Sequence, residues 1–283
     1  MSIRDRFIQG KNQKKKWSML TAYDAPTAGL LEKSGIDLIL VGDSLGMVLL
    51  GYSSTVEVTM DEMIHHAKAV RRGAPNSFII GDLPLKGIEE GPEQALVSAR
   101  RFTQEAEMNA VKLEWSRDAV KTAQLLIRHH IPVMGHIGLT PQSVKKNAGF
   151  RVQGQDAKSA LNIFENAKAF ERSKVFSVVL ECVPSPVGKA ITQNLRVPTI
   201  GIGAGPDCDG QVLVFHDLVG IFNKFTPRFV KRYADLDGQM NQAVLKFRRD
   251  VLTGGFPKKN HSFSMNKEEE KLFLKALADQ RIS

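Results

Sequence analysis

The sequence predicts an α/β domain that closes as a (β/α)8 TIM barrel. Eight short apolar runs recur along the chain, and each is followed by a segment with helix-like character. The runs are continuously apolar instead of alternating, which is typical of parallel strands covered on both faces. Eight such units within about 200 residues favour a closed barrel over an open sheet.

Amphipathic segments with start and stop signals for helices lie between the predicted strands. The predicted strands are 17–24, 36–44, 77–84, 110–115, 131–139, 176–184, 197–205 and 211–219. Thr59 and Glu62 form a capping-box pattern that predicts a helix start, and Gly73 can end that helix. Ser116 is expected to cap a second helix, whose apolar face begins at Ala119.

No Pro/Gly/Ser-rich linker divides the chain, so residues 1–263 are interpreted as one barrel domain with a basic N-terminal segment. Residues 264–283 are expected to form a C-terminal extension, in which Asn266 and Glu269 can cap a helix. Residues 143–155 follow a strand and lack strong periodicity, which predicts a loop on the active face of the barrel.

Composition excludes several classes of protein. With 42% hydrophobic and 24% charged residues, the chain is neither disordered nor collagen-like. Its two cysteines, Cys182 and Cys208, cannot form a disulfide framework and suit a reducing compartment. Residues 1–16 lack the apolar core of a signal peptide, and no apolar run is long enough to cross a bilayer. We therefore expect a soluble, cytoplasmic protein with no membrane partner.

The net charge of +9 is concentrated at the two ends of the chain. Residues 1–20 hold six basic and one acidic residue, and residues 221–283 hold thirteen basic and seven acidic residues. The stretch between them holds twenty basic and twenty-two acidic residues. A nucleic-acid-binding protein more often shows a basic stripe with interleaved aromatics, so no nucleic-acid partner is expected.

Polar or ionisable residues stand at the ends of six predicted strands. They are Asp24, Asp43 with Ser44, Asp82, Lys112 with Glu114, His136 and Glu181. Because a parallel barrel places all its strand carboxyl ends on one rim, these side chains are expected to converge there. The alternative for each Asp is a helix cap or a turn. His136 is a candidate for a supporting hydrogen bond in the site.

Lys112 and Glu114 are two residues apart on one strand and therefore face the same side. Buried Lys and Glu are costly unless they are paired or used. One interpretation is a structural ion pair inside the barrel. The other is a cation for an anionic substrate beside a carboxylate that supports a metal.

The oxygen ligands of Asp43, Asp82 and Glu114 favour Mg²⁺ over zinc. A 2-keto acid can complete the coordination of such an ion with its carboxylate and keto oxygens. The ion would then stabilise an enolate, and a separate base would remove the adjacent C–H proton. Glu181, at the end of the sixth strand, is the candidate for this catalytic base.

Several motifs resemble those of the ketopantoate hydroxymethyltransferase family, in the same order along the chain. They are Thr21–Asp24, Val41–Met47, Val70–Pro75, Asp82–Pro84, Val111–Glu114, Gly135–Ser143, Val152–Gly154, Leu180–Pro184, Ile200–Gly205 and His261–Phe263. The chain departs from the family pattern in a few places. After Glu114, Trp115-Ser116 replaces a common Gly pair; the others are 147–150, 172–174 and the tail after Phe263.

The resemblance implies a TIM barrel of the phosphoenolpyruvate/pyruvate type. It also implies a decameric enzyme that transfers a hydroxymethyl group from 5,10-methylenetetrahydrofolate to 3-methyl-2-oxobutanoate. The product is 2-dehydropantoate, a precursor of pantothenate and coenzyme A. It also implies that Asp43 and Asp82 bind Mg²⁺ and that Glu114 supports the metal.

The family pattern further implies that Asp43, Ser44, Asp82 and Lys112 contact the keto acid and that Glu181 accepts the proton. Two alternatives remain. The first is a Mg²⁺-dependent lyase for a carbon–carbon bond of a 2-keto acid on the same barrel. The second is a non-enzymatic anion- or RNA-binding protein that uses the basic ends.

Overall fold

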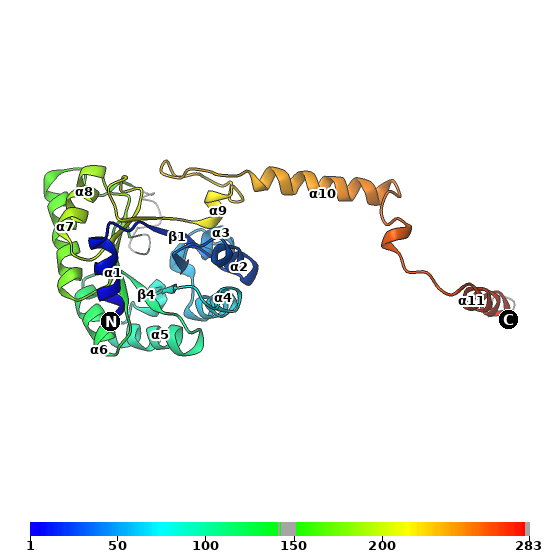
Figure 1. Cartoon of the computed structure of the whole chain (residues 1–283), viewed down its shortest axis with the longest axis horizontal. Coiled ribbons are helices and arrows are strands. Elements are labelled where there is room, and N and C mark those ends of the chain that lie inside the picture. The colour runs from blue at the N-terminus through cyan, green and yellow to red at the C-terminus, as the bar shows by residue number, and fades with distance from the viewer. Residues whose placement is uncertain (141, 143–150, 281–283) are drawn as a thin grey trace. The chain divides into compact units, whose positions relative to one another are not determined.

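A computed structural model describes residues 1–140, 142 and 151–280 of the chain (Figure 1). The chain forms two compact units, Met1–Ala234 and Asp235–Ser283. The domain boundary expected after residue 263 stays a prediction. Across the described residues, no helix is both long and apolar enough to cross a membrane.

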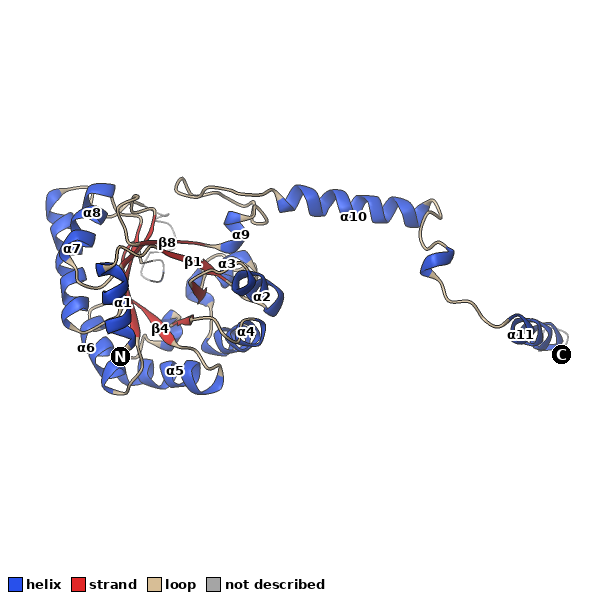
Figure 2. Ribbon diagram, in the orientation of Figure 1, coloured by secondary structure: helices blue, strands red, loops and turns tan. Residues whose placement is uncertain are grey.

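The described residues of the first unit form a closed barrel of parallel strands, as the sequence predicts (Figure 2). The strands follow one another around the barrel in the order β1 to β8. Its strands are β1 (Trp17–Thr21), β2 (Leu38–Val41), β3 (Ile79–Asp82), β4 (Ala110–Glu114), β5 (Val133–Gly138), β6 (Ser177–Glu181), β7 (Thr199–Ile202) and β8 (Gly210–Leu213). Trp17 pairs with Gly210 and Leu20 with Leu213, so β8 returns to β1 and closes the barrel.

Helices surround this barrel. They are α1 (Ile3–Asn12), α2 (Ala25–Lys33), α3 (Leu45–Val48), α4 (Met60–Gly73), α5 (Pro92–Glu105), α6 (Ala119–Arg128), α7 (Ala157–Arg172), α8 (Ser185–Asn194) and α9 (Phe215–Leu218). Two short 3-10 turns, Thr55–Glu57 and Leu85–Gly87, lie in the loops after β2 and β3. The second unit contains α10 (Leu236–Leu252), a 3-10 turn at Lys259–His261, and α11 (Lys267–Gln280).

Local capping signals explain where two of these helices begin. The Thr59 side chain accepts from the Glu62 N–H at 3.3 Å, and the Glu62 carboxylate accepts from the Thr59 N–H at 2.7 Å. This capping box and the end of α4 at Gly73 confirm the sequence prediction. The expected cap at Ser116 was wrong, because α6 begins after Asp118 and Ser116 contributes only its carbonyl, to the Ala119 N–H. In the second unit, the Asn266 side chain accepts from the Glu268 N–H at the start of α11.

Helix α1 precedes the barrel in sequence, and its Phe7 packs into the interior core. The Phe7 ring stacks on Trp17 of β1, with centroids 5.7 Å apart, and meets the edge of Phe176 at 4.8 Å. Met19 and Ile80 belong to the same buried cluster. Burial of this much aromatic and aliphatic surface is the main favourable contribution to folding.

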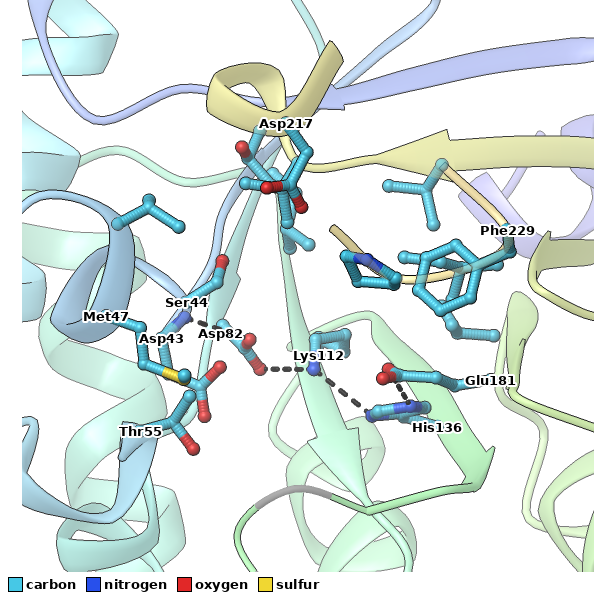
Figure 3. Close-up of a pocket in the computed structure, with 18 of the residues that line it drawn as sticks. Asp43, Ser44, Met47, Thr55, Asp82, Lys112, His136, Glu181, Asp217 and Phe229 are labelled. Atoms are coloured by element: carbon cyan, nitrogen blue, oxygen red, sulfur yellow. Dashed lines mark hydrogen bonds and ion pairs between the residues drawn. The ribbon is translucent and has the colours of Figure 1, made fainter. Parts of the chain in front are cut away.

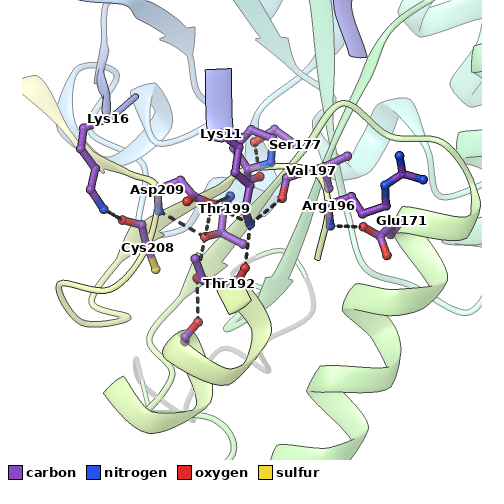
Figure 4. Close-up of polar contacts among 12 residues, drawn as sticks. Lys11, Lys16, Glu171, Ser177, Thr192, Arg196, Val197, Thr199, Cys208 and Asp209 are labelled. Carbon is purple, nitrogen blue, oxygen red and sulfur yellow. Dashed lines mark hydrogen bonds and ion pairs between the residues drawn. The ribbon is translucent and has the colours of Figure 1, made fainter. Parts of the chain in front are cut away.

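A polar network beside this core ties α1 to the amino ends of β7 and β8 (Figure 4). The Lys11 ammonium donates to the carbonyls of Thr192 and Val197 and lies 3.0 Å from the Asp209 carboxylate. The same Asp209 oxygen accepts from the Thr199 N–H at 2.9 Å. Only 15% of each charged side chain is exposed, so the pair is shielded and well supplied with partners.

Candidate active site

One pocket at the carboxyl ends of the strands brings together the residues that the sequence analysis singled out, apart from Asp24. Its lining includes Asp43, Ser44, Asp82, Lys112, Glu114, His136 and Glu181. These side chains come from β3 to β6 and from the turn after β2. Asp24 instead caps α2, because its carboxylate accepts from the Thr27 N–H at 2.7 Å. For Asp24, therefore, the structural alternative is correct.

Lys112 lies between an acidic side of the pocket and a histidine side (Figure 3). On the acidic side, its ammonium is 2.8 Å from Asp82 Oδ1. Asp82 Oδ2 accepts from the backbone N–H of Asp43 at 3.2 Å. This bond joins the end of β3 to the turn after β2 and holds the two carboxylates as neighbours.

Gln142 and Tyr23 orient groups on this acidic side. Gln142 Nε2 donates to Asp43 Oδ2 at 2.9 Å and to the Leu83 carbonyl at 3.0 Å. The Tyr23 hydroxyl lies 2.8 Å from the Ser44 hydroxyl. Sequence reasoning did not assign a role to Gln142 or Tyr23, although both stand inside motifs that it quoted.

On the other side of Lys112, His136 bridges two glutamates. His136 Nε2 is 3.1 Å from Glu181 Oε2, and Nδ1 is 3.4 Å from Glu114 Oε1. Nδ1 is also 3.3 Å from the Lys112 ammonium. Glu181 keeps 16% of its side chain exposed, against 3% for Glu114, so Glu181 is the more accessible carboxylate.

Backbone geometry fixes the end of β6, where Glu181 stands. Cys182 has a positive φ of 49°, and its N–H donates to the Ile202 carbonyl of β7. The Glu181 carbonyl accepts from the Leu139 N–H at 2.8 Å. Gly138, with φ of 97°, passes so close that a Cβ there would collide with the Glu181 carbonyl. Such constraints hold the Glu181 side chain toward the pocket.

Negative charge dominates the pocket. Among its described lining residues, five carboxylates (Asp43, Asp82, Glu114, Glu181 and Asp217) face Lys112 and His136 as the basic groups. Burial raises the pKa of Asp82 and that of Glu114 above their ordinary values, because the charged carboxylates lose hydration. A bound cation would offset this cost.

The two basic groups are held in their charged forms by the same carboxylates. Burial opposes the charge on Lys112, but Asp82 and Asp43 outweigh it and raise the pKa of Lys112 above its ordinary value. Burial and Lys112 lower the pKa of His136. The contacts of His136 with Glu114 and Glu181 outweigh both effects and raise that pKa to about 9.

The donor set fits a hard divalent ion that shares its coordination with a substrate. Glu114 Oε2 is buried and has no hydrogen-bond partner among the described residues, which marks it as an unsatisfied acceptor. Within residues 1–140, 142 and 151–280, no three His, Cys, Asp or Glu side chains form a ready metal-binding group. Mg²⁺ commonly uses one or two carboxylates, completed by substrate oxygens and water.

Apolar and aromatic residues form the rest of the pocket wall. Met47 and Val48 of α3 line it, together with Phe222, Phe225 and Phe229 from the segment after α9. Sequence reasoning missed these aromatic residues. The only signal for them is a run of three phenylalanines spaced by polar and basic residues, which has no helical or strand periodicity.

The predicted loop at residues 143–155 lies largely outside the described residues. Its described end is anchored, because the Gln153 N–H donates to the Cys182 carbonyl at 2.8 Å. The glycine-rich stretch 201–205 is a place of close backbone approach, since a Cβ on Gly203 would lie 2.8 Å from the Phe229 ring.

Solved structures with the same architecture confirm the fold. The structure aligns with phosphonopyruvate hydrolase in complex with oxalate and Mg²⁺ at a TM-score of 0.60 and 11% identity, covering 100% of this chain and 97% of that chain. It also aligns with 2,3-dimethylmalate lyase, a member of the PEP mutase/isocitrate lyase superfamily, at a TM-score of 0.60 and 13% identity. That alignment covers 98% of this chain and 96% of the other.

The closed barrel and the ionisable groups gathered at the carboxyl ends of its strands are typical of (β/α)8-barrel enzymes. The family model described as ketopantoate hydroxymethyltransferase matches residues 3–259, and the chain belongs to this family. It is therefore a transferase enzyme.

Two relatives named 3-methyl-2-oxobutanoate hydroxymethyltransferase illustrate the similarity. The protein of Oleidesulfovibrio alaskensis is 48% identical over 264 residues, or 93% of this chain and 91% of the relative. The protein of Dehalococcoides mccartyi strain CBDB1 is 50% identical over 258 residues, or 91% of this chain and 92% of the relative.

Proposed function

We propose that the protein transfers a hydroxymethyl group from 5,10-methylenetetrahydrofolate to 3-methyl-2-oxobutanoate and yields 2-dehydropantoate, in pantothenate biosynthesis. Family membership and the names of the relatives support this reaction class. The observation that carries the mechanism is the arrangement around Lys112, with Asp43 and Asp82 on one side and Glu181 on the other.

The keto acid would bind over Lys112, whose ammonium supplies a fixed positive charge for the substrate carboxylate. The Ser44 hydroxyl, held by Tyr23, can donate a further hydrogen bond to the substrate. Asp43 and Asp82 would hold Mg²⁺, with Glu114 behind them in support. When bound, this ion supplies Lewis-acid stabilisation for negative charge on the keto oxygen.

Glu181 is the general base in this proposal. Its Oε2 accepts the C3 proton of the keto acid, and the C–H electron pair moves into the enolate. The ion pair with His136, whose Nε2 is 3.1 Å from Glu181 Oε2, fixes the position of that carboxylate. The nucleophilic C3 then forms a bond to the methylene carbon of the folate. Both carbon–nitrogen bonds of that methylene break in turn, and the two folate nitrogens take up the proton removed from C3 and one proton of a water. One water supplies the hydroxyl oxygen of the product.

The experiment that tests this function is Glu181→Gln. Exchange of the C3 proton of 3-methyl-2-oxobutanoate with D₂O, followed by NMR with Mg²⁺ and without folate, should fall by about a thousandfold. Keto-acid binding should persist, because Gln keeps the shape of the side chain. Glu165→Gln, on the exposed face of α7, is the matched control. Undiminished exchange in Glu181→Gln would remove Glu181 from its role.

A requirement for the folate donor separates this reaction from carbon–carbon lyase chemistry on the same barrel. Formation of 2-dehydropantoate should need both 5,10-methylenetetrahydrofolate and a divalent ion, and EDTA should stop it. Turnover of the keto acid without any folate would favour the lyase. A homodecameric assembly and a cytoplasmic location, both implied by the resemblance, stay predictions.

A further inference from the structure

The segment 221–234 follows α9 and supplies one wall of the active-site pocket; it is called the aromatic strap below. Phe222, Phe225, Pro227 and Phe229 of this strap all line the pocket. Phe229 lies on the Glu181 side of the cavity (Figure 3). The strap belongs to the same compact unit as the barrel.

Specific contacts hold the strap in place. Arg232 Nη2 donates to the Thr226 hydroxyl at 2.6 Å and lies 3.3 Å from Asn223 Oδ1. The Tyr233 N–H donates to the Leu218 carbonyl of α9 at 2.8 Å. Phe229 packs against the bare backbone of Gly203, where no side chain could fit. The aromatic strap is therefore held in place as one wall of the pocket.

The keto acid does not account for this wall. A five-carbon keto acid is small, and its polar groups would be bound at Lys112 and the carboxylates. It therefore leaves the three aromatic rings of the aromatic strap without a role. The Phe222 and Phe225 rings meet edge to face, with centroids 5.9 Å apart. Aromatic walls of this kind favour the faces and edges of other ring systems.

The aromatic strap is also strongly basic. Residues 221–234 hold four Lys or Arg and no acidic residue. Lys224, Arg228 and Lys231 are exposed, whereas the pocket they border is rich in carboxylates. A ligand that suits both features has an uncharged ring system for the wall and negative charges that stay outside the pocket.

We propose that the aromatic strap is the binding site for the folate co-substrate. The ring-bearing head packs against Phe222, Phe225 and Phe229, and the glutamate carboxylates of the tail bind Lys224, Arg228 and Lys231. This assignment rests on the proposed function, because it takes the one-carbon donor to be a folate. It also explains how the methylene carbon is delivered on the Glu181 side of the pocket.

Two sets of full-length variants test the proposal, with mono- and triglutamyl 5,10-methylenetetrahydrofolate as co-substrates. The first is the triple variant K224Q/R228Q/K231Q. Its KM for the triglutamyl donor should rise more than tenfold, and its KM for the monoglutamyl donor only about threefold. The matched control is K246Q/R248Q/R249Q, which removes the same number of exposed charges from α10.

The second variant is F229L, which keeps apolar volume but loses the aromatic ring. It should raise the KM for both donors about tenfold, independent of tail length. A cooperative thermal unfolding transition for each variant is the check that it is folded. An unchanged KM for both donors in folded F229L and in the triple variant would overturn the assignment.

C3-proton exchange, which needs no folate, distinguishes failure of this assignment from failure of the proposed function. If the wild-type protein exchanges the proton but forms no 2-dehydropantoate with either donor, the proposed function itself fails. If the wild-type protein turns over with both donors and the strap variants do so with wild-type KM values, only the strap assignment fails.

Discussion

The two ends of the barrel treat buried charge in opposite ways. At the amino end, Lys11 and Asp209 are paired with each other and with backbone groups, so each charge has several partners. At the carboxyl end, the described carboxylates of the pocket outnumber the basic groups, and Glu114 Oε2 has no partner among the described residues. The first arrangement stabilises the fold. The second leaves buried negative charge that a bound ligand would neutralise.

This difference shows where stability and function are separated in the molecule. Substitutions at the amino end should change the free energy of unfolding and leave the reaction of folded molecules alone. Substitutions at the carboxyl end should impair the reaction and change the free energy of unfolding little. Removal of an uncompensated charge there can even stabilise the chain.

The largest effect is expected for Asp82→Asn at the carboxyl end. Asn keeps the size of the side chain, but its one amide oxygen can accept from either the Lys112 ammonium or the Asp43 N–H and not from both, and it lacks the charge that a divalent ion requires. We expect kcat/KM to fall by about a thousandfold or more, with Mg²⁺ binding lost in calorimetric titration. Stability should change by no more than about 1 kcal/mol. Asp61→Asn, on an 86% exposed side chain, is the control. A normal Mg²⁺ titration of Asp82→Asn would contradict the ligand assignment.

An effect of intermediate size is expected for Asp209→Ala at the amino end. This change leaves the Lys11 ammonium without its carboxylate and the Thr199 N–H without its acceptor. Denaturant unfolding should show a loss of about 3 kcal/mol.

The activity per folded molecule of Asp209→Ala should stay at the wild-type level. Asp207→Ala is the control, because its ion pair with Lys189 spans 4.0 Å and is largely exposed. A large drop in turnover of folded Asp209→Ala would break the separation between the two ends.

The smallest effect is expected for Asp217→Asn in the pocket wall. Burial raises the pKa of Asp217 from 3.8 to about 6, against the opposing charge of Arg232. The folded state therefore binds this proton more tightly than the unfolded chain, and the wild-type protein loses stability as pH rises from about 4 to about 6.

Asn at position 217 cannot ionise, so the variant should gain about 1 kcal/mol over the wild-type protein above pH 6. The gain should vanish below pH 4. Urea unfolding of both proteins between pH 4 and pH 7 measures the difference. A gain that is independent of pH would show that the carboxylate at 217 is not the cause.

The strands and the polar floor of the pocket could be predicted from sequence because one rule connects them. Parallel strands place their carboxyl ends together, so ionisable residues at those ends, such as Asp82 and Glu181, must approach one another. Asp24 shows the limit of this rule, since a strand-end Asp can equally cap the next helix. The start of α6 shows another limit, because Ser116 and Asp118 are both plausible caps by type.

The aromatic strap could not be predicted, because nothing in its periodicity connects it to the pocket. Phe229 lies against Gly203, just after the end of β7, so its place at the cavity depends on a tertiary contact. The bond from Gln142 to Asp43 likewise joins residues 99 positions apart. Such contacts depend on how the loops return to the barrel, and they become visible only in three dimensions.

The position of α1 bears on how the protein folds during synthesis. Lys11 is synthesised well before its acceptors at Thr192 and Val197, which lie 181 and 186 positions further along the chain. The closing partner of β1 is β8, which is also translated late. Helix α1 must therefore wait until nearly the whole barrel has been synthesised before it reaches its native contacts. During this wait its Phe7 side chain is open to non-native contacts and to chaperones.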